Sequence, residues 1–435
     1  MQRYGGKITG SIFLDLIVFN SDNLKKQSLN DMSIELLNNH KIHITKQSIH
    51  ERFNTYALLF LKVVLEKILS QQFIDQDKTM GFPNVNRILI KDSTEFQIDE
   101  SLSNAYPGSG GGGSKAAVRI QYEYDILNGK INDLSINAFN DQDSRNSIDT
   151  IDIVKQGDLI IRDLAYMNLS VLSKISDQKA FYLSRINSST KIYELVKGAY
   201  CELDFVKLTE EMKIKKAAML ERQVYIGSRE KLPTRLIIHL MPEDEVAKRL
   251  RRAKENNKKK GRGNLGKDFK ARAGLNLFIS NTKAEDIPIE KVWPMYTLRR
   301  QIELMFKIWK SLVNIDKIKK VKQKRLEIYL FAKLILIVLS WKIIWRVSSW
   351  VYILDNKALS FYKSYKTMMK RIDELRNIFI KDTEKITIFI IKFYEVSKDY
   401  HLLEKRKHKL RSVEVLLYCG AKPERRPMDK IIYVE

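Results

Sequence analysis

Two short stretches decide the expected fold: residues 88–92 read Ile-Leu-Ile-Lys-Asp, and residues 159–163 read Leu-Ile-Ile-Arg-Asp. Each has three aliphatic residues, one cation and then an aspartate. Because side chains alternate between the two faces of a strand, each aspartate shares a face with the aliphatic residues two and four positions before it. Asp92 and Asp163 therefore stand at the carboxyl ends of two predicted core strands.

A pair of strand-end carboxylates suggests a metal site. If the two strands are adjacent and parallel, Asp92 and Asp163 lie side by side, where like charges repel unless a cation neutralises them. Carboxylate oxygens are hard ligands that suit Mg²⁺. The alternative is a pair of unrelated aspartates that end or cap two strands, and the pattern alone leaves both interpretations open.

The surrounding residues 86–189 alternate short apolar runs with helical stretches, which predicts an α/β domain. Residues 116–126 and 130–139 are joined through Asn128-Gly129, a strong signal for a β-hairpin. Residues 107–115 (PGSGGGGSK) have nearly the spacing of a phosphate-binding loop. Ser114-Lys115 reverses the required Lys-Ser order, so a flexible loop is expected instead.

Helical regions are expected on both sides of this domain. Residues 1–85 carry apolar residues at helical spacing, and Thr45 is the predicted N-cap of a short basic helix that contains Lys46 and Arg52. A helix, a turn and a basic helix fit either a helix-turn-helix DNA-binding motif or an ordinary helical hairpin. Residues 346–435 are also predicted to be helical.

Residues 190–290 are expected to form a separate β-rich insertion with a strongly basic stretch. Between Lys248 and Arg272 stand twelve lysines and arginines against two acids. A charge run of this kind is often a solvated helix face. Its density and glycine-rich middle favour contact with a phosphate backbone instead. The residues expected to make that contact are Lys258, Lys259, Lys260 and Arg262.

The composition of the 435-residue chain fits a basic intracellular protein of several domains. Lysine and arginine number 77 against 52 acids, a net charge of +25, which favours a polyanionic partner: nucleic acid first, an anionic membrane surface second. Two cysteines give no disulfide framework and fit a reducing cytosol. The most apolar stretch is interrupted by Lys333 and Lys342, which indicates a buried core helix rather than a membrane span.

A third segment, residues 293–312 (WPMYTLRRQIELMFKIWKSL), is predicted to be one helix with Pro294 in its first turn. At about 100° per residue, four of its polar side chains fall within an arc of roughly 60°. Its carboxylate could complete a three-acid metal site, and its cations could hold phosphate oxygens. These four residues are Tyr296, Arg299, Glu303 and Lys310.

On these residues the chain resembles the DDE transposases of bacterial insertion sequences, specifically the insertion-sequence-four family. That family's Tyr-Arg-Glu-Lys signature has two, three and six residues between its members, and residues 296–310 satisfy every gap. Asp92-Ser93-Thr94 resembles the first acidic motif, and Asp163-Leu164-Ala165-Tyr166 resembles the second. Ala165 departs from the glycine of many members, the N-terminus is short for the group, and the last 90 residues match loosely.

The resemblance implies an RNase H-like catalytic core over residues 86–189, completed by helices within residues 291–345. It implies Asp92, Asp163 and Glu303 as a catalytic triad that binds two Mg²⁺ ions, for which Mn²⁺ can substitute. It also implies contacts from Tyr296, Arg299 and Lys310 to the DNA backbone.

The implied partners are double-stranded DNA, as terminal inverted repeats and target, and a second copy of the chain on paired ends, with residues 346–435 as the expected dimerisation region. The implied reaction cleaves the insertion-sequence ends, passes through a DNA hairpin and joins the ends to target DNA in the bacterial cytoplasm, at the nucleoid.

Three other functions stay open at this point. The first is a catalytically inactive or truncated DNA-binding remnant that regulates transposition. The second is an unrelated metal-dependent nuclease of the RNase H type. The third is a protein of the membrane surface, although no membrane partner is expected.

Overall fold

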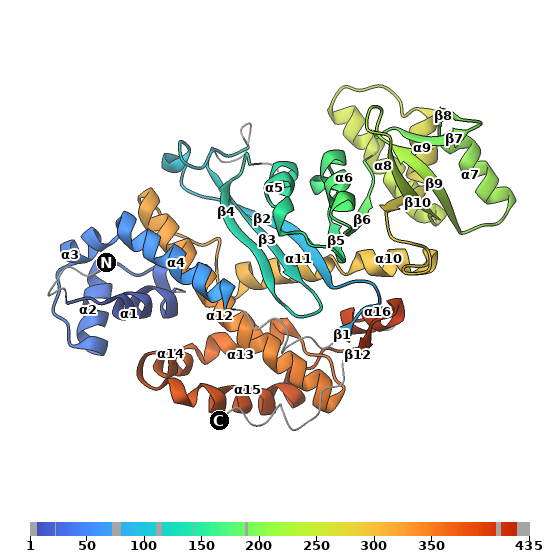
Figure 1. Ribbon diagram of the computed structural model, residues 1–435. Helices are drawn as coiled ribbons and strands as arrows, with labels where there is room; N and C mark the ends of the chain where they lie inside the picture. The colour runs from blue at the N-terminus through green and yellow to red at the C-terminus, as the bar shows by residue number, and fades with distance from the viewer. Residues whose placement is uncertain are drawn as a thin grey trace.

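The computed structural model describes residues 7–21, 23–71, 80–109, 115–141, 143–187, 190–405 and 410–423. Its centre is a single mixed sheet of ten strands in the order β4-β3-β2-β5-β6-β11-β10-β9-β7-β8 (Figure 1). The predicted α/β class is therefore confirmed. Most of the glycine-rich loop, residues 110–114, lies outside the described residues.

The first five strands form the part of the sheet in which the aspartates were expected. β2 pairs antiparallel with β3, β3 pairs antiparallel with β4, and β2, β5 and β6 run parallel to one another. The predicted hairpin is confirmed, because β3 and β4 are joined through Asn128-Gly129. These strands are β2 (Arg87–Gln97), β3 (Ala117–Asp125), β4 (Ile131–Ala138), β5 (Asp158–Arg162) and β6 (Phe181–Arg185).

The strands of the expected insertion continue the same sheet. β11 pairs antiparallel with β6, so no break in hydrogen bonding separates residues 190–290 from the preceding strands. Sequence patterns assign strands one at a time and carry no signal for this edge-to-edge pairing. The added strands are β7 (Ile192–Val196), β8 (Ala199–Glu202), β9 (Met219–Ile226), β10 (Leu232–Leu240) and β11 (Leu275–Ser280), with helices α7 (Phe205–Ile214), α8 (Glu243–Lys259) and α9 (Lys267–Ala273).

The alternation seen in the sequence divides the sheet into two apolar faces. Ile88 and Ile90 belong to one buried cluster, and Leu89 and Ile160 belong to a second cluster on the reverse side. Helices α10 (Ile289–Thr297), α11 (Arg300–Ser311) and α12 (Gln323–Asp355) cover the first face (Figure 1). Helices α5 (Asp143–Asp149) and α6 (Leu169–Asp177) lie on the other (Figure 1).

Helix α12 is 33 residues long. Its length and composition would suffice to cross a membrane, but 78% of its most apolar window is buried inside the protein. The buried Lys333 ammonium donates to the carbonyl oxygen of Val313 at 2.9 Å. This hydrogen bond offsets part of the cost of burying the charge. The prediction of a buried core helix is confirmed.

Helices from both ends of the chain pack around α12 (Figure 1). Thr45 caps α3 as predicted, with its hydroxyl oxygen accepting from the Ser48 amide at 3.2 Å. The N-terminal helices are α1 (Gly10–Leu14), a π-helical turn (Asp15–Phe19), α2 (Leu29–His40), α3 (Lys46–Arg52) and α4 (Thr55–Ser70). The C-terminal helices are α13 (Phe361–Lys370), α14 (Ile372–Lys381), α15 (Ile386–Tyr400) and α16 (Ser412–Cys419), and β1 (Met80–Gly81) pairs with β12 (Lys422–Pro423).

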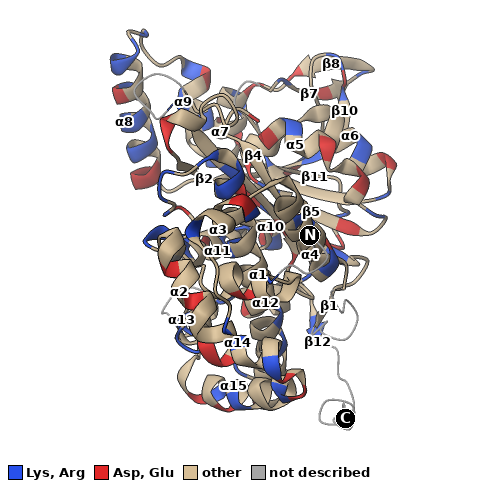
Figure 2. Cartoon of the chain, turned by 90° about the vertical axis from the view of Figure 1, so that its left-hand side faces the viewer, with Lys and Arg blue, Asp and Glu red and all other residues tan. Residues whose placement is uncertain are grey.

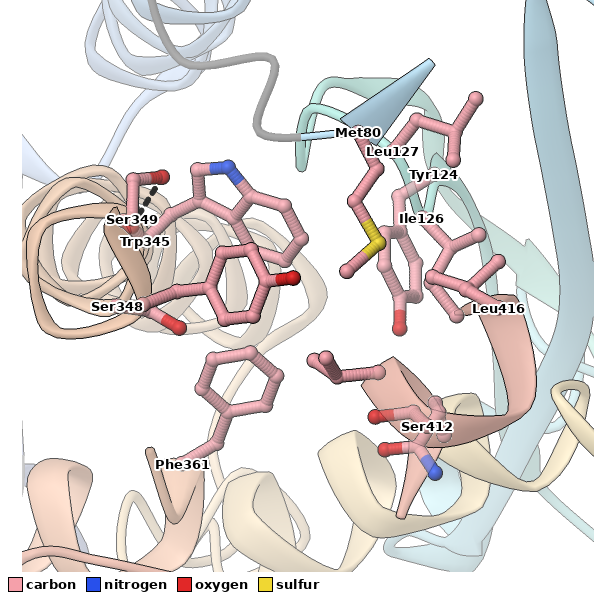
Figure 3. Close-up of a pocket in the computed structure, with 13 residues that line it drawn as sticks. Met80, Tyr124, Ile126, Leu127, Trp345, Ser348, Ser349, Phe361, Ser412 and Leu416 are labelled. Atoms are coloured by element: carbon pink, nitrogen blue, oxygen red, sulfur yellow. Dashed lines mark hydrogen bonds between the residues drawn. The ribbon is translucent and has the colours of Figure 1, made fainter. Parts of the chain in front are cut away.

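A small cavity of about 60 Å³ marks the junction between the sheet and the C-terminal helices. Figure 3 shows Tyr124 facing Trp345 and Phe361 across it, with Leu416 of α16 closing one side. A cavity of this size holds a few water molecules, whereas small-molecule sites usually measure several hundred Å³. The junction therefore serves packing rather than ligand binding.

Candidate active site

The two aspartates meet as the strand pattern predicted. β2 and β5 are adjacent and parallel, and Ile90 is level with Ile161 in their register. Asp92 stands two residues further along β2, and Asp163 follows directly after the end of β5. The predicted strand end is confirmed for Asp163 but wrong for Asp92, because β2 continues to Gln97 through its pairing with β3. Both side chains therefore lie on the face covered by α11, level with the carboxyl end of β5.

The helix that carries the remaining polar residues differs from the prediction. Residues 293–312 do not form one helix, and Pro294 lies inside α10 instead of in a first turn. The Pro294 carbonyl accepts from the Thr297 hydroxyl at 2.6 Å, and the Leu298 amide bonds to Met295, three residues back. This tightened turn separates α10 from α11 at Leu298 and Arg299, because hydrogen bonds to the third residue replace those to the fourth.

Arg299 stands at that turn and contacts all three predicted acids. Its Nη1 lies 2.8 Å from Asp92 Oδ2, and its Nη2 lies 2.7 Å from Glu303 Oε1. Its Nε lies 3.8 Å from Asp163 Oδ1. The structure therefore brings Asp92, Asp163 and Glu303 together around a single guanidinium.

Asp92 has the most perturbed environment of the three acids. Burial is the largest cause that raises its pKa to about 6, and the nearby Asp163 and Asp143 carboxylates act in the same direction. The Ser93 amide, which donates to Asp92 Oδ1 at 2.8 Å, and the Arg299 charge oppose the rise. A desolvated carboxyl beside like charges gains more than an exposed one from a bound cation.

Tyr296 and Lys310 lie on either side of this group. The Tyr296 hydroxyl donates to Asp163 Oδ1 at 3.5 Å, and burial raises the pKa of the phenol to about 12. The Lys310 ammonium donates to the Glu95 carbonyl oxygen at 2.9 Å. Tyr296, Arg299 and Lys310 thus contact Asp163 or β2 directly, and Glu303 joins them through Arg299, despite the break in the helix.

The three acids have the chemistry to bind a divalent metal, but their spacing in this structure does not form a metal site. Over the described ranges, no three His, Cys, Asp or Glu side chains are close enough to hold one ion. At this site the Arg299 guanidinium lies between the acids. The three carboxylates are nevertheless the hard oxygen ligands that Mg²⁺ prefers.

A polar network beside Asp92 was not predicted from the sequence. Gln121 Nε2 donates to Asp143 Oδ1 at 2.8 Å, and the Tyr166 hydroxyl donates to Gln121 Oε1 at 2.5 Å. Asp143 begins α5 and lies close enough to raise the pKa of Asp92. Its sequence context is polar and without periodicity, so no local signal marks it.

The residues of the basic stretch that were predicted to contact DNA lie at the end of α8. Lys258 and Lys259 form its last turn, Lys260 is its C-cap, and Arg262 follows. All four side chains are exposed, and we refer to them as the basic cluster. Figure 2 shows acids near the start of α8 and mainly Lys and Arg toward its end. Some earlier cations of α8 are paired within the protein, as Lys248 is with Asp244 and Glu245.

Comparison with known proteins decides the family. Residues 83–339, which contain all three acids, match the family model described as the transposase DDE domain. The chain belongs to the DDE transposase family. The resemblance predicted from the motifs is confirmed, and the transposase is therefore an enzyme that processes DNA in the transposition of insertion sequences.

The chain aligns with transposases from bacteria over most of their length. A transposase for insertion sequence element IS231F of Bacillus thuringiensis subsp. israelensis is 31% identical over 381 residues, 84% of this chain and 78% of the relative. One for IS231B of Bacillus thuringiensis subsp. berliner is 26% identical over 405 residues, 90% of this chain and 84% of the relative. One for IS1151 of Clostridium perfringens is 27% identical over 434 residues, 94% of this chain and 90% of the relative.

Proposed function

We propose that this transposase cleaves insertion-sequence ends and joins them to target DNA, with Asp92, Asp163 and Glu303 as its metal-binding triad. The observation that carries the proposal is the convergence of these acids on Arg299, beside β2 at the carboxyl end of β5. The strand order β4-β3-β2-β5-β6, three antiparallel strands followed by two parallel ones, supports an RNase H-like core.

The triad would hold two Mg²⁺ ions, with Mn²⁺ as a substitute. When bound, the ions would lower the pKa of an attacking water or 3′ hydroxyl and stabilise the leaving oxygen of the phosphodiester. Arg299 would exchange its carboxylate partners for a phosphate, to which its planar fork can donate two hydrogen bonds. Tyr296 and Lys310 would hold the adjoining DNA backbone and so fix the scissile bond in line.

A hairpin pathway requires a base turned out of the duplex and held by an aromatic ring. Trp293 is the candidate, since it lies on α10 next to the site, is 37% exposed, and packs against the Phe278 ring with 5.6 Å between centroids. Trp293→Ala should leave the first nick intact and reduce hairpin formation by at least tenfold, measured on denaturing gels. Equal loss of both products would contradict this role.

The remaining regions would serve DNA binding and assembly. The basic cluster and the helices of residues 1–85 would bind the transposon end, and residues 346–435 would support a homodimer on paired ends. Lys46 and Gln47 at the start of α3 are exposed, as a DNA-reading helix requires. The reaction would take place in the bacterial cytoplasm, where the nucleoid DNA lies.

The decisive experiment uses a plasmid that carries the DNA flanking the gene. The purified protein is incubated with it and Mg²⁺ or Mn²⁺, and breaks are mapped for the wild type, Glu303→Gln and the matched control Glu290→Gln, an exposed acid of α10. We expect breaks at defined ends that Glu303→Gln abolishes while DNA binding stays within twofold, with the control unaffected.

The opposite results would overturn different parts of the proposal. Full cleavage by Glu303→Gln would remove Glu303 from the triad. Binding without any breaks in the wild type would favour the alternative of an inactive DNA-binding remnant that regulates transposition.

A further inference from the structure

Each of the two strand motifs has a cation immediately before its aspartate, and the proposed reaction does not use these cations. Because neighbouring residues point to opposite faces, Lys91 and Arg162 lie behind the sheet from the acids. Lys91 is fully buried, and its ammonium lies 2.7 Å from Asp133 Oδ2 and 2.9 Å from Thr150 Oγ1.

Arg162 is held in the same way. Its Nη2 donates to Glu123 Oε1 at 2.9 Å, and its Nη1 donates to Ser147 Oγ at 2.6 Å. The exposed fractions of the two side chains are 6% for Arg162 and 0% for Glu123. Burial by itself would raise the pKa of Glu123, but the Arg162 and Lys91 charges outweigh it and hold that pKa below its usual value.

The four charged residues form one line across the sheet. The strand registers place Asp133 level with Glu123, Glu123 level with Lys91, and Lys91 level with Arg162. We call Asp133, Glu123, Lys91 and Arg162 the ionic row. The row crosses β4, β3, β2 and β5 one residue before the two aspartates.

The row is also anchored to one helix. Ser147, which binds Arg162, belongs to α5, and Thr150, which binds Lys91, follows directly after α5. The middle of β2 and the end of β5 are thus fixed from behind to the same short segment. A shift of either strand along the other would break at least one of these contacts.

Packing alone does not require charges at these positions. Leu89 and Ile160, two residues earlier on the same face, are apolar and fully or almost fully buried. Burying ion pairs costs desolvation free energy, and hydrophobic residues of similar volume are often equally stable or more so. What distinguishes Lys91 and Arg162 is that each precedes one of the two strand-borne acids.

We propose that Lys91 and Arg162 are positioning residues, whose ion pairs fix the middle of β2 and the end of β5 so that Asp92 and Asp163 bind divalent metal. This inference rests on the proposed function, because it concerns the same metal site. Mg²⁺ demands near-ideal octahedral geometry at short metal–oxygen distances, so a small displacement of either strand at these positions weakens its binding. Removing groups that orient metal ligands commonly lowers metal affinity 10- to 100-fold.

The test replaces each cation with an apolar side chain of similar length, as Lys91→Met and Arg162→Met. The full-length variants are compared for Mn²⁺ binding, measured from the electron paramagnetic resonance signal of free Mn²⁺, and for the Mg²⁺ concentration that gives half-maximal nicking. Thermal unfolding is recorded for each variant. We expect metal binding to weaken at least tenfold.

Arg87→Met is the matched control. Arg87 pairs with Asp158 at 2.5 Å, so it too joins β2 to β5 through a largely buried ion pair, but at the first residue of each strand. The two positions are four residues apart, roughly 13 Å along a strand. Arg87→Met should lower the unfolding temperature as much as Lys91→Met does while leaving Mn²⁺ affinity within twofold.

Two further variants keep the test decisive if Lys91→Met folds poorly. The double variant Lys91→Met/Asp133→Leu removes both charges, so it should regain thermal stability and still bind Mn²⁺ weakly. Arg162→Lys keeps the charge and should restore part of the affinity.

Two contrary results are distinguishable. Unchanged Mn²⁺ affinity in folded Lys91→Met and Arg162→Met, with loss of binding in Asp92→Asn, would overturn the positioning role and leave the metal site standing. Unchanged binding in Asp92→Asn would overturn the metal site and the positioning role together.

Discussion

The basic cluster offers a prediction whose size follows from the structure. The triple change Lys258→Gln, Lys259→Gln and Lys260→Gln removes three exposed, adjacent ammonium groups at the end of α8. Each cation that neutralises a phosphate adds about 0.9 to the slope of log affinity against log salt. If all three contact the backbone, the slope should become shallower by about 2.7.

That change in slope is readily measured. Between about 50 and 200 mM salt, the wild type should lose roughly 40-fold more affinity than the triple variant. The salt concentration rises fourfold over this range, and four to the power of the slope difference, about 2.7, is roughly 40. The assay is fluorescence anisotropy of a labelled duplex at four salt concentrations in that range. Sequence preference should change little, since phosphate contacts carry no base information.

A matched control separates the cluster from net charge. Lys366→Gln, Lys370→Gln and Lys381→Gln remove three exposed lysines from α13 and α14 and lower the net charge of +25 by the same amount. Their slope should equal that of the wild type. An unchanged slope in the α8 variant would show that the cluster is only a solvated face, and equal changes in both variants would show that binding follows total charge.

Two further predictions concern stability, both measured by thermal or urea unfolding. Burial is the largest cause that raises the pKa of Asp125 to about 7, so the folded state retains a proton that the unfolded state releases near pH 4. The free energy of unfolding should therefore fall as pH rises from about 4 to 7, by up to roughly 4 kcal/mol, and Asp125→Asn should remove this pH dependence. If the variant and the wild type lose stability in parallel over this pH range, the prediction is wrong. Gly129 has φ +73° and a Cβ there would overlap the Trp345 indole ring, so Gly129→Ala should cost about 3 kcal/mol. Gly198→Ala, with φ +82° and open space, should cost about 1 kcal/mol, and equal losses would contradict the overlap.

The sequence by itself determined the local elements and the chemistry of the site. Alternation around Asp92 and Asp163 predicted two strands, Asn128-Gly129 predicted a hairpin, and Thr45 predicted a helix start, and the structure contains each of them. The spacing of residues 296–310, together with the motifs that begin at Asp92 and Asp163, predicted the family. These signals are readable because they depend on periodicity, turn chemistry and residue type within a few positions.

Only the tertiary structure decided how those elements meet. It paired β2 with β5, joined the strands of residues 190–290 to the same sheet, and broke the predicted helix at Arg299. It also placed one guanidinium among three acids and put the ionic row behind two of them. Strand pairing, burial and charge contacts join residues tens to hundreds of positions apart, and their free energies depend on neighbours and desolvation that no local pattern records.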